Sequence, residues 1–243
     1  MKAVNPETKR ADNVQAARGT VRLLKKINPL PGEIFLDIGA NVGYVSNCMA
    51  ELGLRVYSYE PFPLCNRDAL PIHANVTRYE KAVTSDGRNI DMHIRTEAME
   101  RGYLCSAKAV KRPDSSFTKF GNIESVPVQE AIDAVKPDII KIDIEGGEWE
   151  ILPVADLSCA RALFIEFHGH NSMKWPEAIK RLHHQGFAPV FGWPKNARWE
   201  EGAIKGAGFW IELLFEKKNV SLDSINGLAE LLKGPGPEQT VKK

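Results

Sequence analysis

Ionisable side chains gather where two apolar segments of the sequence end. Residues 138–144 and 161–167 are rich in Ile, Leu and Phe, as buried strands are. At or just beyond these ends stand Asp143, Glu145, Glu148, Glu150, Glu166, His168 and His170. Parallel strands bring such ends to one edge of a sheet, where carboxylates and imidazoles can take a proton from a hydroxyl group or bind a divalent cation.

The spacing selects two of the four acids around position 145. Lys141 and Asp143 alternate, so they share one face of a strand, and Asp143 stands at its tip. We expect Asp143 and Glu145 to be catalytic. Acids are favoured in the first turn of a helix, and this suffices to explain Glu150.

The two histidines allow three interpretations. Glu166, His168 and His170 project to one side if the strand stays extended to position 170. We predict His168 to be a general base, because histidine titrates near neutral pH. Alternatively, Asp143, Glu145, Glu166 and one of the histidines bind a divalent ion, or the histidines pack at the rim of a loop. The sequence leaves open whether these residues bind a metal ion.

A glycine-rich turn lies near the start of the chain. The apolar run 34–38 contains Asp37 and is followed by Gly39, Asn41 and Gly43, after which an amphipathic segment begins. This order predicts a buried strand, a tight turn and a helix N-terminus, where backbone N–H groups can approach a ligand. A second apolar run, 55–59, ends in Glu60, and an acid in that place can accept ribose hydroxyls.

Three blocks of the sequence resemble one known family. DIGANVGY at 37–44, YEP at 59–61 and DIIKIDIEGGEWEIL at 138–152 are similar to the FkbM family of S-adenosylmethionine (SAM)-dependent methyltransferases, and the resemblance extends over about residues 34–215. It implies an α/β fold, the Rossmann-like sheet of class I methyltransferases, mostly parallel with an antiparallel last strand and helices on both faces. It also implies O-methylation of a hydroxyl on a sugar, glycan or small natural product.

The resemblance assigns SAM as the cofactor and gives the motif residues their roles. Asp37 would lie near the cationic amino group of SAM, and Asp143 would face the methyl donor. The other residues expected at the cofactor are Gly39, Asn41 and Gly43 along the methionine part, Glu60 and Phe62 at the ribose, and Lys81 and Ala82 beside the adenine. Two alternatives remain, a SAM-binding module without catalysis and an NAD-linked oxidoreductase, although Asn41 interrupts the NAD fingerprint.

The wider pattern predicts one main domain with two extensions. We expect an N-terminal helical extension at 1–30, whose helix caps the sheet edge, a methyltransferase domain at 31–218, and a C-terminal helix with a disordered tail at 219–243. Within the domain a third strand is expected near 76–83. Residues 90–128 are expected to be the least regular part, with strand-like pieces at 90–94 and 123–128 and a basic loop at 108–119 between them. Trp175, Trp193 and Trp199 fall in predicted late loops.

Composition limits the partners of the chain. The net charge is +1 and no basic face is apparent, so we expect no nucleic acid partner. The sequence shows neither a signal peptide nor an apolar run that could span a bilayer, which predicts a cytoplasmic protein without a membrane span. Its four scattered cysteines should therefore be reduced. The expected acceptor is a small molecule or a glycan.

Overall fold

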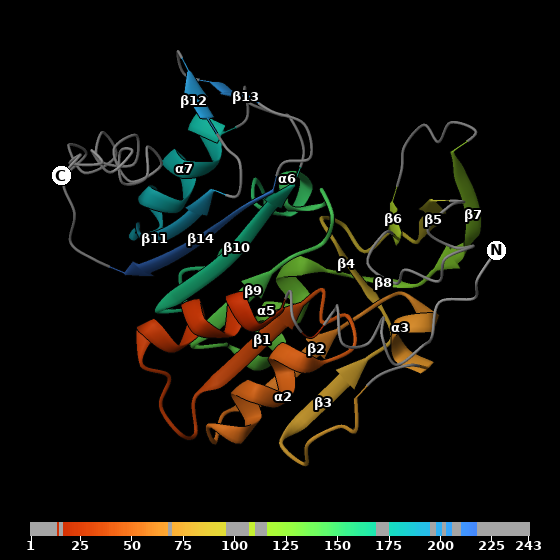
Figure 1. Cartoon of the computed structure of the whole chain (residues 1–243), viewed down its shortest axis with the longest axis horizontal. Coiled ribbons are helices and arrows are strands. Elements are labelled where there is room, and N and C mark those ends of the chain that lie inside the picture. The colour runs from red at the N-terminus through yellow and green to blue at the C-terminus, as the bar shows by residue number, and fades with distance from the viewer. Residues whose placement is uncertain are drawn as a thin grey trace, which may run out of the picture.

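A sheet of seven strands forms the centre of the protein (Figure 1). The computed structural model describes residues 14, 17–67, 70–95, 107–109, 116–168, 175–194, 198–200, 203–205 and 210–217. In spatial order the strands are β11 (Phe187–Pro194), β14 (Trp210–Lys217), β10 (Ala162–His168), β9 (Ile139–Ile142), β1 (Ile34–Ile38), β2 (Arg55–Tyr59) and β3 (Val76–Tyr79).

The pairing of the strands confirms the predicted sheet. From β10 through β9, β1 and β2 to β3, every neighbouring pair is parallel. Strand β14 runs antiparallel to both β10 and β11. The last strand is therefore the antiparallel one, and the carboxyl ends of β1, β2, β9 and β10 lie at a single edge.

Helices cover both faces of this sheet because successive strand residues point to opposite sides. Helical residues 17–24, the 3-10 turn η1 (Lys25–Ile27) and α2 (Tyr44–Glu51) cover one face, and α5 (Val128–Val135), α6 (Glu148–Ile151) and α7 (Trp175–His184) cover the other. The buried apolar residues on the face under the N-terminal helix and α2 include Leu24, Met49, Phe35, Ile139, Phe164 and Leu214. Those on the face under α5, α6 and α7 include Ile132, Trp149, Leu182, Leu36, Ile140 and Leu163.

The N-terminal helix packs on the face of the sheet, so its predicted place at the edge is wrong. Leu24 is fully buried in one cluster with Phe35 and Phe164 from β1 and β10. Arg161 secures the end of this segment, since its guanidinium pairs with Glu33 at 2.6 Å and donates to the carbonyl of Ile27. This face of the sheet is apolar, and α2 and the N-terminal helix together bury it from water.

The single strand expected near 76–83 is two strands in different sheets. After β3 the chain leaves the central sheet, and β4 (Ala82–Thr84) pairs in parallel with β8 (Ser125–Pro127). The short helix α3 (Pro63–Arg67) precedes β3. The strand is interrupted because the chain changes its pairing partner. The N–H of Ala82 donates to the carbonyl of Glu124, so the chain no longer pairs with β2.

The strand-like pieces predicted at 90–94 and 123–128 match β5 (Ile90–Arg95) and β8, and the segment between them adds two more strands to a three-stranded antiparallel sheet. Strand β5 pairs with β6 (Ala107–Ala109) and β7 (Phe117–Ile123). The basic loop predicted at 108–119 is thus partly strand, and Lys119 on β7 forms a 2.7 Å ion pair with Asp91 on β5. In Figure 1 this sheet and the hairpin β12 (Arg198–Glu200)–β13 (Ala203–Lys205) lie on opposite sides of α6.

Other predictions have mixed outcomes. The three tryptophans belong to regular elements rather than loops, with Trp175 in α7, Trp193 in β11 and Trp199 in β12. Cys48, Cys65 and Cys159 form no disulfide in the structure, and Cys105 lies outside the described residues. The predictions for His170, the start of the chain and the C-terminal tail also fall outside them. Within the described ranges, no helix is long and apolar enough to cross a bilayer.

Candidate active site

The residues selected from the sequence meet at the carboxyl edge of the central sheet. The glycine turn follows β1, Glu60 follows β2, Asp143 follows β9, and His168 ends β10. These four strands are consecutive in the sheet, in the order β10, β9, β1 and β2, and each neighbouring pair is parallel. In open α/β sheets this edge is the usual place for ligands.

The turn between β1 and α2 is wound in the left-handed region. The φ angles of Gly39, Asn41 and Gly43 are 85°, 50° and 84°. At Gly39 a Cβ atom would stand 1.8 Å from the carbonyl oxygen of Asp143, so the turn and the residue after β9 are in direct contact. The side chain of Arg78 donates to the carbonyl of Asn41 and supports this strained residue from β3. The glycines are therefore required by the close approach as well as by the backbone angles.

A buried ion pair lies directly under the turn. Asp37 has no exposed surface, accepts a 2.6 Å hydrogen bond from the hydroxyl of Ser46, and lies 3.1 Å from the Nζ of Lys141. The same Nζ donates to the carbonyl of Gly39 at 2.8 Å and lies 3.3 Å from Asp143. Burial alone would lower the pKa of Lys141, but the two carboxylates outweigh it and raise the pKa. Asp37 thus supports the turn through Lys141 and offers no exposed carboxylate to a ligand.

Glu60 closes the other side of the turn. One of its carboxylate oxygens accepts the N–H of Asn41 and the other accepts the N–H of Phe62, each at 2.8 Å. Burial raises the pKa of Glu60 above its ordinary value, although these hydrogen bonds oppose the shift. Each oxygen still has a lone pair for a further donor, so the group fits the diol of a ribose.

Of the other residues expected at the cofactor, Phe62 and Ala82 are well buried, whereas the side chain of Lys81 is exposed. The ring of Phe62 packs edge-on against Phe120, with the ring centres 4.9 Å apart, and only 1% of the residue is exposed. Ala82, at the start of β4, is also buried, and Lys81 next to it forms a 3.2 Å ion pair with Glu124. The described contacts make Phe62 a support for Glu60 through its backbone N–H.

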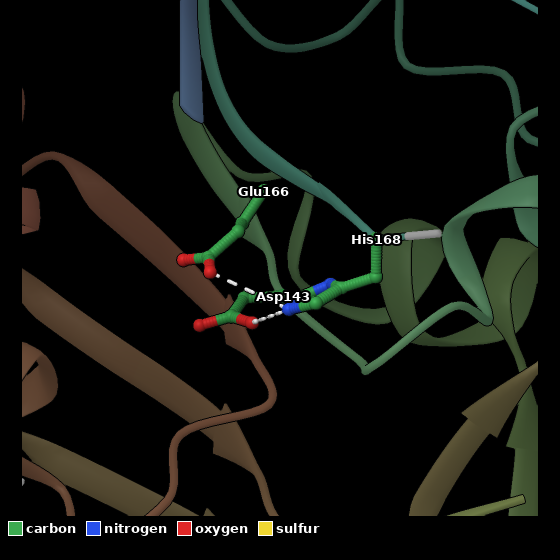
Figure 2. A group of neighbouring side chains, drawn as sticks. All are labelled: Asp143, Glu166 and His168. Carbon is green, nitrogen blue, oxygen red and sulfur yellow. Dashed lines mark ion pairs between the residues drawn. The ribbon is translucent and has the colours of Figure 1, made fainter. Parts of the chain in front are cut away.

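Three carboxylates face the Nε2 atom of His168 at the tips of β9 and β10. We call Asp143, Glu145, Glu166 and His168 the acid–histidine group. The Nε2 atom of His168 lies 3.4 Å from Glu166 and 3.9 Å from both Asp143 and Glu145. Figure 2 shows the imidazole pointing between the carboxylates of Asp143 and Glu166. The alternation predicted for Glu166 and His168 is confirmed, since both approach Asp143 from one side of β10.

The charge of His168 differs from the prediction. Burial alone would lower the pKa of its imidazole, but hydrogen bonds to Glu148 and Glu166 and the charge of Glu145 raise it to about 11. The raised pKa favours a protonated ring at neutral pH and argues against a base that titrates near neutrality, so the catalytic role of His168 stays a prediction. Burial and the charge of Asp143 raise the pKa of the neighbouring Glu166 carboxyl, which makes it a stronger proton acceptor than an ordinary glutamate.

Glu148 is a site residue that the sequence reasoning did not select. Its carboxylate is completely buried and lies 3.1 Å from the Nδ1 of His168, on the opposite side of the ring from the other acids. Glu150, two residues on, instead pairs with Arg88 on the surface, as expected for a residue outside the site. An acid directly after the Gly-Gly pair was the available signal, because its side chain can reach back to the N–H groups of a tight turn.

The acid–histidine group has the composition of a metal site. Ligand atoms of Asp143, Glu166 and His168 all lie within 4.8 Å of one another. Two carboxylates and one imidazole are a donor set found for divalent transition metals. A cation in this place would need the Nε2 atom of His168 in its neutral form, so the proton and the cation compete for that atom.

A known family accounts for most of this arrangement. The sequence model of the methyltransferase FkbM domain matches residues 37–189, more than half of the chain. The chain belongs to the FkbM methyltransferase family. The matched region begins at Asp37 and includes the glycine turn, Glu60 and the whole acid–histidine group. A search of curated proteins gave no match.

Solved structures of other methyltransferases resemble this FkbM chain in fold. A putative RNA methyltransferase from Pyrococcus horikoshii has 11% sequence identity and a TM-score of 0.46, with 83% of each chain covered. The magnesium protoporphyrin IX methyltransferase of Synechocystis with bound SAM has 15% identity and a TM-score of 0.46, covering 90% of this chain and 86% of that one. The seven-stranded sheet, parallel except where β14 pairs with β10 and β11, is the arrangement expected for this methyltransferase family.

Proposed function

We propose that this FkbM family member transfers the methyl group of SAM to a hydroxyl oxygen of a sugar, a glycan or a small natural product. The observation that supports oxygen as the acceptor is the acid–histidine group beside the glycine turn. A hydroxyl is a weak nucleophile until a base takes its proton, and this group offers several carboxylates for that purpose. Family membership supports methyl transfer over the NAD-linked alternative.

The residues at the edge of the sheet suit SAM. When bound, SAM supplies an electrophilic methyl group on a positively charged sulfur. The turn at Gly39, Asn41 and Gly43 would hold its methionine part, and Glu60 would accept hydrogen bonds from its ribose through the lone pairs that Asn41 and Phe62 leave free. Contact between Gly39 and the carbonyl of Asp143 brings the methionine end of this site beside the acid–histidine group.

The carboxylates, rather than the imidazole, are the proposed proton acceptors. His168 already holds a proton at neutral pH, because the acids around it raise its pKa to about 11. Asp143 and Glu166 stand on one side of its ring, and the raised pKa of Glu166 matches the task of a base better than an ordinary carboxylate would. In this mechanism the hydroxyl proton passes to the Asp143–Glu166 pair, while the positive charge of His168 stabilises the remaining carboxylate.

A divalent cation is the competing occupant of the same group. Asp143, Glu166 and His168 would hold it, and it would lower the pKa of a coordinated hydroxyl. Dialysis against a chelator followed by addition of Mg²⁺ or Mn²⁺ distinguishes the two cases. Activity that survives the chelator supports the proton mechanism, and activity that returns only with the cation supports the metal mechanism.

Binding of SAM is the first test of this proposal. Titration calorimetry should detect SAM and its demethylated product, and the Glu60→Ala variant should lose about 1.5–3 kcal/mol of that binding free energy, because a charge-assisted hydrogen bond is removed. Glu51→Ala, at the end of α2, is an exposed control that should bind normally. Equal affinity in the Glu60 variant and the wild type would contradict the assigned ribose contact.

Transfer of labelled methyl groups tests the chemistry. The purified protein is incubated with methyl-labelled SAM and a cell lysate, and the labelled products are identified by mass spectrometry. A methyl ether on a small molecule or glycan supports the proposal. SAM binding without any labelled product would leave the alternative of a module that binds SAM without catalysis, and a methylated nucleic acid or a product methylated on nitrogen would contradict the proposed acceptor.

A further inference from the structure

A completely buried carboxylate lies behind the acid–histidine group. Glu148 begins α6, and its side chain has no exposed surface. An unpaired carboxylate in such a place would be costly, so its partners indicate what the charge is used for. Three N–H groups converge on it, two from the backbone after β9 and one from the ring of His168.

The backbone partners belong to the turn that carries Glu145. The N–H groups of Ile144 and Gly146 donate to the two carboxylate oxygens of Glu148, each at 2.9 Å. Glu145, between them, has a φ of 55°, a left-handed conformation that side chains other than glycine seldom adopt. The carboxylate of Glu148 thus holds a strained turn, and that turn directs Glu145 toward His168.

The ring partner is the Nδ1 atom of His168. Both oxygens of this carboxyl group already accept backbone N–H groups, so the 3.1 Å contact fits a hydrogen on Nδ1 that is donated to Oε1 of Glu148. Nε2 is thereby directed toward Glu166 at 3.4 Å and Asp143 at 3.9 Å. The next residue, Trp149, donates its indole N–H to the carbonyl of His168 at 2.7 Å, so α6 holds both the ring and the backbone of this residue.

We infer that Glu148 is the positioning residue of the active site, which aligns the β9 turn and the His168 ring with each other. The inference rests on the proposed function of the acid–histidine group. A carboxylate can accept from all three donors, whereas a glutamine would turn its amide NH₂ toward a backbone N–H or the ring, and an alanine would leave three buried donors without an acceptor. A carboxylate behind a functional histidine also selects which ring nitrogen faces the reacting groups.

The ring hydrogen of His168 is the direct test, and it needs no substrate. In the wild-type protein labelled with ¹⁵N-histidine, NMR should show a ring N–H resonance that is protected from exchange and is absent in His168→Gln. This resonance should disappear or exchange rapidly in Glu148→Ala and stay unchanged in Glu150→Ala, a matched control two residues away that pairs with Arg88. A wild-type protein in which no His168 ring N–H is protected would overturn the inference.

Kinetics separate positioning from folding. Glu148→Gln should lower turnover about 10–100-fold, the usual effect of losing the carboxylate behind a functional histidine, while SAM affinity stays within about twofold, since Glu148 has no described contact with the glycine turn or Glu60. Glu150→Gln should keep both. Normal turnover in Glu148→Gln, or an equal loss in Glu150→Gln, would overturn the inference.

The tests of Glu148 and of the proposed function fail in different ways. Absence of SAM binding by the wild type refutes the function, whereas the NMR experiment examines Glu148 without any ligand. If Glu148→Gln does not fold, Trp149→Phe provides the second variant, since it removes only the indole hydrogen bond to His168. It should move the His168 ring resonance and lower turnover, and an unchanged resonance together with normal turnover would count against the positioning role of α6.

Discussion

Replacing Lys141 with methionine should show how strongly the glycine turn depends on one buried charge. The Nζ atom contacts the carbonyl of Gly39 at 2.8 Å, Asp37 at 3.1 Å and Asp143 at 3.3 Å, and its side chain is only 3% exposed. Methionine keeps nearly the same volume but carries no charge and no donor. The carboxylate of Asp37 would then be buried with the hydroxyl of Ser46 as its remaining hydrogen-bond donor.

The expected loss is about 3–5 kcal/mol of unfolding free energy, the usual cost of removing one partner of a buried ion pair. Most of this loss comes from the stranded negative charge, so a second substitution, Asp37→Asn, should recover part of it. The nearby carboxylates raise the pKa of Lys141. Its side chain is therefore charged at every pH below the ordinary lysine pKa, and the charge is lost only as pH rises through the raised pKa. The loss should therefore be the same at any pH between about 6 and 9.

Urea unfolding of four proteins measures this effect, namely the wild type, Lys141→Met, Asp37→Asn and the double variant. Lys180→Met, at an exposed position of α7, is the control for the change of side chain and should cost less than about 0.5 kcal/mol. A Lys141→Met protein as stable as the Lys180→Met control would refute the reasoning. A double variant that is less stable than the sum of the single losses predicts would also refute it.

Three further predictions concern neighbouring residues. Gly39→Ala should unfold the protein or lower its stability by more than about 3 kcal/mol in thermal melts, because a Cβ would stand 1.8 Å from the carbonyl oxygen of Asp143; a normal melt would contradict the observed contact. Asp143→Asn should fold normally and lose at least about tenfold in turnover, and full activity would remove it from the proposed proton path. Arg161 lowers the pKa of Glu33, so this ion pair stabilises the protein above the ordinary glutamate pKa and is lost as pH falls through the lowered value. Urea unfolding should accordingly show that Arg161→Gln costs about 1 kcal/mol near pH 7 and less near pH 3, and an equal cost at both would contradict it.

Local sequence patterns were sufficient to predict most of the central sheet and the glycine turn after β1. The apolar runs at 34–38, 55–59 and 138–144 each contain a strand of the parallel sheet, because a strand buried on both faces needs apolar residues at nearly every position. Gly39 and Gly43 have the positive φ angles that a tight turn requires, and Glu60 stands beside them. These features depend on neighbouring residues in the chain, which is why they are readable from the sequence.

Predictions that depended on distant partners were less successful. The periodicity of the N-terminal helix indicates that it has an apolar side, but only the packing of Leu24 against Phe35 and Phe164 shows that this side covers a face of the sheet. The run near 76–83 has a strand-like composition throughout. Its division into β3 and β4 results from two different partners, β2 and β8, which the sequence does not indicate.

The charge of His168 is the clearest case of a property that the tertiary structure decides. Its position beside Glu166 identified it as a candidate for chemistry, and the sequence alone suggested a base with a pKa near neutrality. Glu145 and Glu148 come from the turn and helix after β9, and only the parallel pairing of β9 with β10 brings them to the ring. Since a pKa depends on the charges and burial around a group, the sequence determined that a histidine stands at the site, and the fold decided that it holds its proton.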